Sequence, residues 1–452
     1  MLKEIFKPEI IELIEKKEWK ALKEVLSDWP PQDIASLITS LEEKEAFIVF
    51  RLLPKSVASE VFSELDAETH EIILSQLTND QVKEIFLELS PDDRTELFEE
   101  LPPEATQKII NLLPPQERKE ALQLLGYPED SVGRLMTPDY IAIKAEWTVE
   151  QAIEYIREKG IDAETINMVY VIDDNNKLID DIPIRRLIIS NPKNKISSIM
   201  DENFISIFVN EDQEEAVRTM KRYRLNVLPV VDQNGILLGI VTIDDIMDIM
   251  EEEDSEDFTK VSGISSHDVG VDIITDLLKS PITTLYKSRI FWLFALLIMD
   301  LFTGGIINSF ETLIGKYIVL VTFLPVLVDT AGNAGAQSAT LTIRALALGT
   351  VKPADWVKLF FKEISVSTLL GISMGIGISF MGFVRGGFNI ARVIVLSMFI
   401  NVVIGSLIGI ILPFIFAGLK KDPATASTPL ITTLADIIGT GIYLTIATLM
   451  LG

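Results

Sequence analysis

The first 128 residues place apolar side chains at a regular spacing of twelve. One series, with Trp29 in phase before it, is Leu41, Leu53, Leu65, Leu77, Leu89, Leu101, Leu113 and Leu125. A second series lies three positions earlier: Ile38, Phe50, Phe62, Leu74, Phe86, Phe98, Ile110 and Leu122. Turn and capping residues follow the leucines, as in "LDAE", "LTND", "LSPDD" and "LPPE", which predicts that short helices end and restart there. The pattern predicts an all-α repeat superhelix over residues 1–128, which by itself is typical of a scaffold or protein-docking module.

From about residue 129 the pattern changes to alternating strands and helices, and it occurs twice. The stretch "LMTPDYIAIKAEWTVEQAIEYIREKG…NMVYVIDDNNKLIDDIPIRRLI" is answered by "IMDENFISIFVNEDQEEAVRTMKRYRLNVLPVVDQNGILLGIVTIDDIMDI". Both copies run through a short strand, a helix, an apolar strand, an Asp-Asn turn, a strand and a helix. The sequence therefore predicts a tandem α/β pair over residues 129–255, with copies at about 129–196 and 197–255.

This internal repeat resembles a pair of CBS (cystathionine-β-synthase) domains, which typically sense adenosine nucleotides or ions. The second copy keeps the family's signature as Gly239, Thr242 and Asp245. The first copy has Asp180 in place of the glycine and Arg186 in place of the acid that normally holds a ribose. The resemblance therefore implies a nucleotide site at Thr242 and Asp245, an altered first site, and the alternative of a dimerisation module without ligand.

A run of acids follows the second copy in "IDDIMDIMEEEDSEDF". On a helix, Asp245, Asp248 and Glu252 are three and four residues apart and lie on one face. Like charges at this spacing destabilise a helix unless a cation relieves them. Oxygen ligands without histidine suit magnesium or calcium. The alternative is a solvated acidic linker, as charge runs often are.

The last third of the chain is apolar and predicts a five-helix transmembrane domain over residues 289–452. Residues 256–288 are too polar to span a membrane and predict an amphipathic connector helix. Five apolar stretches are each long enough to cross a bilayer: 289–310, 317–343, 357–384, 391–418 and 429–451. Five helices are few to enclose an ion path within one subunit, which favours a homodimer with the path between the two subunits.

Basic residues predict the orientation of these spans. With five crossings, nine basic residues lie on the same side of the membrane as the N-terminal region, and three lie on the opposite side. Positive residues mark the cytoplasmic side, so we expect cytoplasmic N-terminal domains and a C-terminus outside the cell inner membrane. The N-terminus is amphipathic and acidic, unlike a secretory signal.

Polar residues at membrane depth are the candidates for an ion path. Asp329, Asn333 and Gln337 are four residues apart and form one stripe on a helix. The alternative for the two amides is hydrogen bonding between helices that only holds a bundle together. In the last span Thr432 lies one turn before Asp436. A carboxylate in a bilayer is costly, and no basic residue at matching depth is an obvious partner for Asp436.

Composition narrows the partners. The formal net charge is −26, with 57 acidic and 28 basic residues in 1–270 but nine and twelve in 271–452. The acidic first part argues against a nucleic-acid partner and favours cations. The chain has no cysteine and only two histidines, so a bound metal is expected to be a hard ion such as Mg²⁺. No nucleophile–base set or phosphate loop is present, so an enzyme is not expected.

The stretches "LPVLVDTAGNAGAQSATLTIRALALG" and "PATASTPLITTLADIIGTGIYL", after a CBS pair and an acidic helical domain, resemble the MgtE family of magnesium channels. The resemblance covers essentially the whole chain. It implies a homodimer whose cytoplasmic domains sense magnesium. The pore aspartate of the family matches Asp436, and the residue whose carbonyl lies along the ion path matches Thr432. The acids at Asp300 and Asp329 depart from the family pattern, as does Ala331 for a glycine.

The same resemblance implies metal ligands in the cytoplasmic domains. The matching carboxylates are Glu60, Asp92, Glu96, Glu214, Asp245 and Asp248. One acid does not carry over, because Arg224 or its neighbours stand where an aspartate is expected.

These features predict a magnesium-selective channel or transporter in which hydrated Mg²⁺ passes along a dimer-interface pore. Asp436, Thr432, Asn333, Gln337 and Asp329 are the expected pore residues. Mg²⁺ bound to the acidic cytoplasmic domains is expected to close it. ATP at the CBS pair is a further candidate ligand. The alternative is a non-conducting, membrane-anchored sensor of Mg²⁺ or nucleotide.

Overall fold

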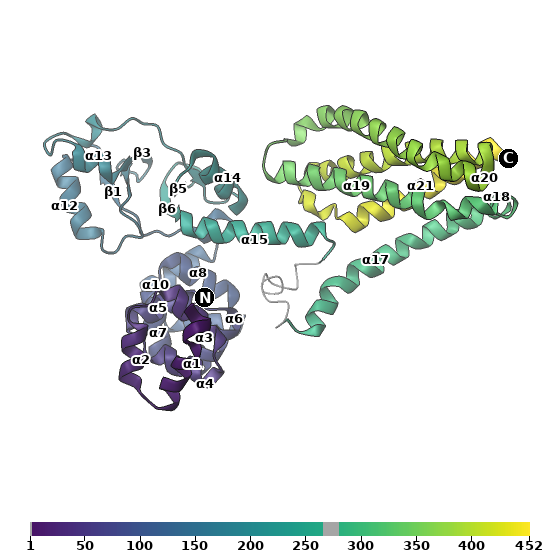
Figure 1. The fold of residues 1–452 in the computed structure, drawn as a ribbon. Helices are drawn as coiled ribbons and strands as arrows, with labels where there is room; N and C mark the ends of the chain where they lie inside the picture. Colours follow the sequence, from purple (N-terminus) through teal and green to yellow (C-terminus); the bar gives the residue numbers. More distant parts are fainter. Residues whose placement is uncertain (1, 265–279) are drawn as a thin grey trace. The chain divides into compact units, whose positions relative to one another are not determined.

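A computed structural model describes residues 2–264 and 280–452, with the chain running from an N-terminal helical array to a set of long apolar helices (Figure 1). By its internal contacts the chain divides into two units, one ending at Ile249 and the other running from Met250 to Gly452. Each unit is considered by itself.

The N-terminal array consists of short helices at the predicted spacing. After α1 (Leu2–Glu15) and α2 (Trp19–Leu26), eight helices begin twelve residues apart. They are α3 (Pro31–Ser40), α4 (Glu43–Leu52), α5 (Lys55–Ser63), α6 (Ala67–Gln76), α7 (Asn79–Glu88), α8 (Pro91–Glu100), α9 (Pro103–Leu112) and α10 (Pro115–Leu124). Prolines open four of them in the first turn, where no intrahelical N–H is needed. Thr78 and Gln81 form a capping box on α7.

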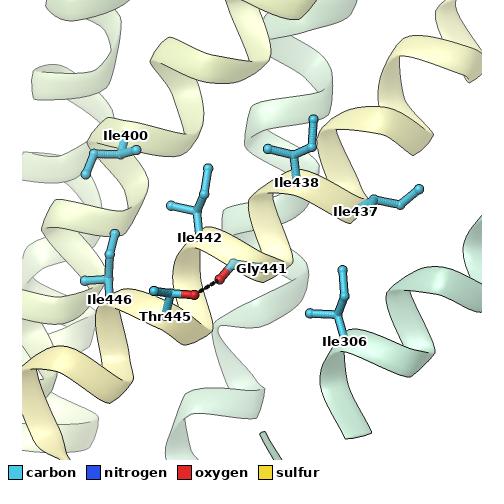
Figure 2. A pocket seen from close by; sticks show the side chains of 8 residues that line it. All are labelled: Ile306, Ile400, Ile437, Ile438, Gly441, Ile442, Thr445 and Ile446. Carbon is cyan, nitrogen blue, oxygen red and sulfur yellow. Dashed lines mark hydrogen bonds between the residues drawn. The ribbon is translucent and has the colours of Figure 1, made fainter. Parts of the chain in front are cut away.

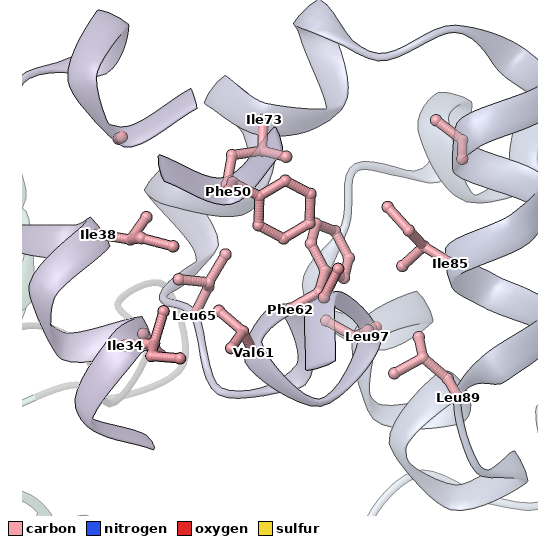
Figure 3. Close-up of a cluster of buried hydrophobic side chains, with 14 of the residues drawn as sticks. Ile34, Ile38, Phe50, Val61, Phe62, Leu65, Ile73, Ile85, Leu89 and Leu97 are labelled. Carbon is pink, nitrogen blue, oxygen red and sulfur yellow. The ribbon is translucent and has the colours of Figure 1, made fainter. Parts of the chain in front are cut away.

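Helices two apart in the sequence pack on each other in this array, as α3 does on α5, α5 on α7 and α7 on α9. The buried aromatic rings form a chain, with centroids 6.0 Å apart between Phe62 and Phe86 and 5.3 Å between Phe86 and Phe98. Figure 3 shows the aliphatic side chains packed around Phe50 and Phe62. The predicted apolar series therefore forms the core, except that Leu122 is 54% exposed in the last helix.

The α/β repeat forms two small sheets with the same order. The first has β1 (Ala142–Lys144), β2 (Met168–Ile172) and β3 (Leu178–Pro183), and the second has β4 (Ile207–Phe208), β5 (Val227–Val231) and β6 (Leu237–Thr242). In each, the first pair is parallel and the second antiparallel. The helices are α11 (Val132–Leu135), α12 (Val149–Lys159), α13 (Ile184–Ile189), α14 (Gln213–Tyr223) and α15 (Ile243–Val261), with a 3₁₀ turn η1 at Ile196–Ser198.

Gly239 explains part of the second copy's signature. Thr137 donates its N–H to Ile240 O at 2.9 Å and accepts from Ile240 N in return. A Cβ atom on Gly239 would lie only 2.7 Å from Thr137 O. Glycine is therefore required because a second chain segment crosses this strand in direct contact.

The apolar third consists of α17 (Ile282–Ser309), α18 (Glu311–Lys316), α19 (Leu324–Ala347), α20 (Trp356–Gly418) and α21 (Thr428–Leu451). Short 3₁₀ segments precede α19, α20 and α21: η2 (Ile318–Thr322), η3 (Pro353–Asp355) and η4 (Pro423–Thr425). Within the described residues, four helical segments are long and apolar enough to cross a membrane: Ile282–Ser309, Ile318–Ala347, Pro353–Gly418 and Thr428–Leu451.

Two predicted boundaries differ from the helices. The helix α15 continues past residue 255 to Val261, and α17 begins at Ile282, before the predicted first span. Most of the predicted connector, residues 265–279, lies outside the described residues.

The predicted third and fourth spans form one helical run with a break at Gly387, where φ is 72° and ψ is −174°. The two parts lie against each other in antiparallel order. A Cβ on Gly371 would contact Phe399, one on Gly375 would contact Val395, and one on Gly382 would contact Ala391. The long segment is therefore a hairpin of two helices.

Candidate functional site

The polar residues of α19 lie on one exposed face of the helix. Asp329, Asn333 and Gln337 are exposed, whereas the opposite face of α19 is buried among small residues. Asn333 Nδ2 donates to Asp329 Oδ2 at 3.1 Å, so the stripe is linked within itself. Asn333 thus bonds within α19, and both the ion-path prediction and the alternative of bonding between helices stay predictions.

This face adjoins the helix that carries Asp436. A Cβ on Gly332 of α19 would lie 3.3 Å from the Thr432 side chain of α21, so the two helices touch at this level. Thr432 Oγ1 donates to Pro429 O at 2.9 Å, which satisfies the hydroxyl inside its own helix. Because α19 and α21 run in opposite directions here, Asp329 and Asp436 lie at nearly the same depth.

Asp436 is half-buried, and the acidic groups that act on it electrostatically are Asp300 of α17 and Asp329 of α19. One turn away, Asn401 of α20 donates Nδ2 to Gly439 O at 3.2 Å and holds α21 in place. Asn401 Oδ1 is buried without a hydrogen-bond partner. The three aspartates come from three different helices, which the spacing within any one helix does not reveal.

In the part of the chain that the structure describes, neither a closed metal cage nor an aliphatic pocket among the membrane helices offers an ion site. Within residues 2–264 and 280–452, no three Asp, Glu, His or Cys side chains are grouped to hold a metal. Figure 2 shows a pocket between α17, α20 and α21 whose walls are aliphatic. Its one hydroxyl, Thr445 Oγ1, donates to Gly441 O at 2.7 Å. A hydrated divalent ion needs oxygen ligands, so this pocket does not suit one.

A second set of acidic residues lies within the first unit, where two helix N-termini bring carboxylates within electrostatic range of one another without grouping three of the described carboxylates as metal ligands. Asp92 and Asp93 occupy the first turn of α8, and Asp244 and Asp245 the first turn of α15. Glu164 of the first CBS copy is close enough to Asp92, Asp93 and Asp244 to be repelled by their charges. We call these five residues, Asp92, Asp93, Glu164, Asp244 and Asp245, the acidic cluster.

Burial and mutual repulsion raise the pKa values of Asp92, Asp93, Glu164 and Asp245. Burial first, and then the charge of Asp92, raises the pKa of Asp245 to about 8 and that of Glu164 to about 7. The same two causes raise the pKa of Asp93 to about 6. The pKa of buried Asp92 is also raised, with Asp244 adding to the effect of burial. Such groups gain from a proton or a cation at neutral pH.

The structure brings together two of the expected sensor residues, Asp92 and Asp245. Glu214 instead forms an ion pair with Arg218 one turn along α14. The other expected sensor residues, Glu60, Glu96, Asp248 and Glu252, are exposed. Sequence reasoning missed Asp93, Asp244 and Glu164. The double acids "DD" at two helix starts were a signal for the first two, whereas Glu164 meets them only through the tertiary fold.

The nucleotide candidates differ between the CBS copies. In the second copy Thr242 Oγ1 donates to Asp245 Oδ2 at 2.7 Å, which orients the carboxylate. In the first copy Arg186 Nη2 donates to Asp201 Oδ2 at 2.9 Å and its Nη1 to Ile199 O at 3.1 Å. Asp180 is fully buried and accepts from Asp201 N at 2.9 Å. The first copy therefore fills its ribose-acid position with an internal ion pair.

Comparison with known families covers most of the chain. Residues 324–446 match the MgtE family model, a divalent cation transporter, and residues 29–130 match the MgtE intracellular N domain. The CBS domain model matches residues 132–189 and 196–252. Magnesium transporter MgtE of Thermus thermophilus is 36% identical over 445 residues, covering 97% of both chains. That of Bacillus subtilis is 36% identical over 326 residues, covering 72% of this chain and 70% of the relative.

Solved structures agree for the cytosolic part. The cytosolic domain of the Mg²⁺ channel MgtE in complex with ATP matches with a TM-score of 0.52 at 36% identity, covering 54% of this chain and 99% of that chain. The soluble part of a magnesium transporter matches with a TM-score of 0.52 at 27% identity, covering 56% of this chain and 99% of that one. The chain belongs to the MgtE family of magnesium transporters.

Proposed function

We propose that the chain forms a magnesium-selective channel or transporter in the cell inner membrane. The observation that carries this is the position of Asp436, half-buried on an apolar helix and flanked by the polar face of α19. The only basic residue of α19 and α21 is Arg344, near the end of α19 and away from Asp436. A permeating cation is then the partner that makes this carboxylate tolerable at membrane depth.

The pore of this proposal lies between two subunits. Mg²⁺ sheds water reluctantly, so one carboxylate per subunit and nearby carbonyls suit a largely hydrated ion. Asp436 and the carbonyl of Thr432 would face the ion from each subunit of a homodimer. The exposed stripe of Asp329, Asn333 and Gln337 supports this, because it points out of its own protomer.

The proposed topology has five crossings in the lipid bilayer, with the N-terminal domains in the cytoplasm and the C-terminus outside. The four apolar helical segments of the described residues support five proposed crossings, because α20 bends into a hairpin at Gly387. An odd number places the two ends of the chain on opposite sides. The division proposed for the chain is a helical array (1–128), a CBS pair (129–255), a connector (256–288) and the pore domain (289–452).

The proposed regulator is Mg²⁺ itself, bound to the cytoplasmic acids. The acidic cluster joins the helical array to the CBS pair and carries carboxylates whose repulsion a divalent ion would relieve. Ion binding would favour the compact arrangement and, through α15, the closed pore. Glu60, Glu96, Glu214, Asp248 and Glu252 are further candidate ligands in the same domains.

Nucleotide binding is proposed for the second CBS copy only. A hydrogen bond holds Thr242 beside Asp245, the acid expected at the ribose position, and a solved MgtE cytosolic domain is in complex with ATP. The Arg186–Asp201 pair opposes a ribose at the first site.

Divalent-cation uptake into liposomes carrying the full-length protein tests the proposal. Uptake by the wild type is expected to fall as magnesium rises on the side of the cytoplasmic domains. Asp436→Ala is expected to abolish uptake while leaving the purified protein folded. Folded wild-type protein without flux at any magnesium level would favour the alternative, a membrane-anchored sensor that does not conduct.

A further inference from the structure

The end of α15 packs against the start of the helix that carries Asp436. Val261 lies in an apolar cluster with Ile343 of α19, Ala424 and Ala426 before α21, and Ile431 in its first turn. The contact is close, because a Cβ on Gly263 would lie 3.1 Å from Pro429 Cγ. Gly263 has φ of 71°, a left-handed conformation that ends the helix there. Apolar packing and a helix stop thus fix this end of α15.

A lysine on α15 is held between two carboxylates at the same contact. Lys260 Nζ lies 2.8 Å from Asp422 Oδ2, just before α21, and 2.6 Å from Glu256 Oε1, one turn earlier on α15. Burial alone would lower the pKa of Lys260, but hydrogen bonds and the charges of Asp422 and Glu256 raise it above its ordinary value. The ammonium is therefore present throughout the physiological pH range, and it bridges α15 to the segment that leads into α21.

A second cation makes a similar bridge from α19. Arg344 Nη1 donates to Asp254 Oδ1 on α15 at 2.9 Å. Both side chains are more than half exposed, so this pair is the weaker of the two. One bridge starts from α19 and the other from Asp422 in the segment between α20 and α21. Both end on α15, where Asp254 and Lys260 are nearly two turns apart.

We propose that Lys260, with Arg344 in support, is a built-in cation that holds α15 against the start of α21 without a bound divalent ion. Lys260 is a positioning residue, because it acts on α21 and not on the permeating ion. This inference concerns regulation and therefore rests on the proposed transport function. The two bridges would set the fraction of closed pores in the absence of magnesium. Magnesium bound at the acidic cluster would increase that fraction further.

Accessibility of a buried residue tests the contact directly. Ser427, the residue before α21, is fully buried, and a Cβ on Gly263 would lie 3.6 Å from its Oγ. The chain has no cysteine, so Ser427→Cys provides a single thiol. Its labelling by a soluble maleimide is measured on the purified full-length protein in EDTA. Slow labelling of the parent is expected, and Lys260→Met is expected to raise the rate about threefold to thirtyfold as the half-buried pair is lost.

Matched variants distinguish loss of the Lys260–Asp422 ion pair from a general destabilisation of the protein. Lys260→Arg keeps the charge and is expected to label as slowly as the parent. Lys421→Met removes a neighbouring exposed lysine and is expected to change nothing. Asp422→Asn removes the charge of the other partner, and it replaces Lys260→Met in the comparison if that variant elutes as misfolded protein. High salt is expected to speed labelling of the parent more than that of Lys260→Met.

Equal labelling of the parent, Lys260→Met and Asp422→Asn would overturn the proposal, as would equal acceleration by Lys421→Met. The readout needs no transport, so a folded protein that conducts nothing would leave the labelling result standing and contradict only the proposed function. In liposomes that do conduct, Lys260→Met is expected to need more magnesium to close than Lys260→Arg.

Discussion

Two glycines of α20 set the distance between α19 and the second arm of the hairpin. A Cβ on Gly405 would lie 2.2 Å from Ala331 O, and one on Gly409 would lie 2.1 Å from Gly335 O. Backbones approach this closely only where both helices present small residues. The packing matters for the site because α19 carries the polar stripe, and the same arm of α20 holds α21 through Asn401.

Gly405→Ala is therefore expected to destabilise the membrane domain. One methyl group must push two backbones apart, and overpacking of this kind costs about 1–3 kcal/mol. A lower melting temperature of the purified protein in detergent, with weaker cation uptake, is expected. Gly377→Ala is the matched control, because a Cβ at Gly377 of the same helix meets no atom within 4 Å. Equal melting of the two variants would show that the close approach does not matter for stability.

At the scale of elements, two helix starts with paired acids define the acidic cluster. The N-terminus of a helix stabilises negative charge, so α8 and α15 each tolerate an acid pair alone. Together with Glu164 they are partly buried and close enough to repel one another, and burial first and this repulsion second raise the pKa values of Asp93, Glu164 and Asp245. We therefore expect the contact between the helical array and the CBS pair to weaken as these carboxyl groups lose their protons, and to be strengthened by the divalent cation proposed to bind there.

The pH dependence of this contact follows from the direction of the shifts. These carboxyl groups bind protons more tightly in the folded protein than in the unfolded chain, whose values are near 4. Their contribution to stability is complete below about pH 4 and is lost as pH rises through about 6 to 8. Without divalent cations, the melting temperature of a fragment of residues 2–264 is expected to fall between pH 5 and pH 8.

Two additions make this measurement specific. Mg²⁺ is expected to restore most of the lost stability at pH 8, where the carboxylates are ionised. Asp93→Asn is expected to flatten the profile around pH 6, whereas Glu158→Gln, on an exposed position of α12, is expected to leave it unchanged. A profile that is flat in the unaltered fragment would show that the cluster does not govern this contact.

At the scale of the whole molecule, the proposed topology depends on the hairpin in α20. A straight helix of 63 residues would be about 95 Å long, roughly three times the hydrocarbon thickness of a bilayer. The backbone at Gly387 lies in a region that only glycine adopts readily. The bend thus divides the run into two arms of spanning length.

Single cysteines introduced into the cysteine-free chain check this topology in intact cells. An impermeant maleimide added outside is expected to label Arg385→Cys, next to the bend. Lys352→Cys and Lys421→Cys, at the two ends of the hairpin, are expected to react only after the membrane is permeabilised. Labelling of all three from one side would contradict a hairpin that crosses twice.

Local periodicity predicted the elements but not the sites that several elements form. The leucine spacing predicted the helices of the array because each repeat has its own cap and apolar face. The doubled strand pattern likewise predicted both sheets. Hydropathy reports the thickness of the bilayer, not the ends of helices, so it missed that α17 starts at Ile282 and that α20 is continuous up to Gly387. Glu164 and the Lys260–Asp422 bridge depend on segments far apart in sequence.

Helices α3 to α10 begin every twelve residues, so this part of the array consists of equivalent twelve-residue repeats. Deleting or duplicating twelve residues returns every later side chain to the same phase, whereas a change of one residue turns the next helix's apolar face away from its neighbours. Only two such repeats, α9 and α10, separate the acids of α8 from the CBS pair. Adding or removing repeats before α8 would change the length of the array and leave the acidic cluster intact. Adding or removing repeats after α8 would move Asp92 and Asp93 away from the other acids of the cluster.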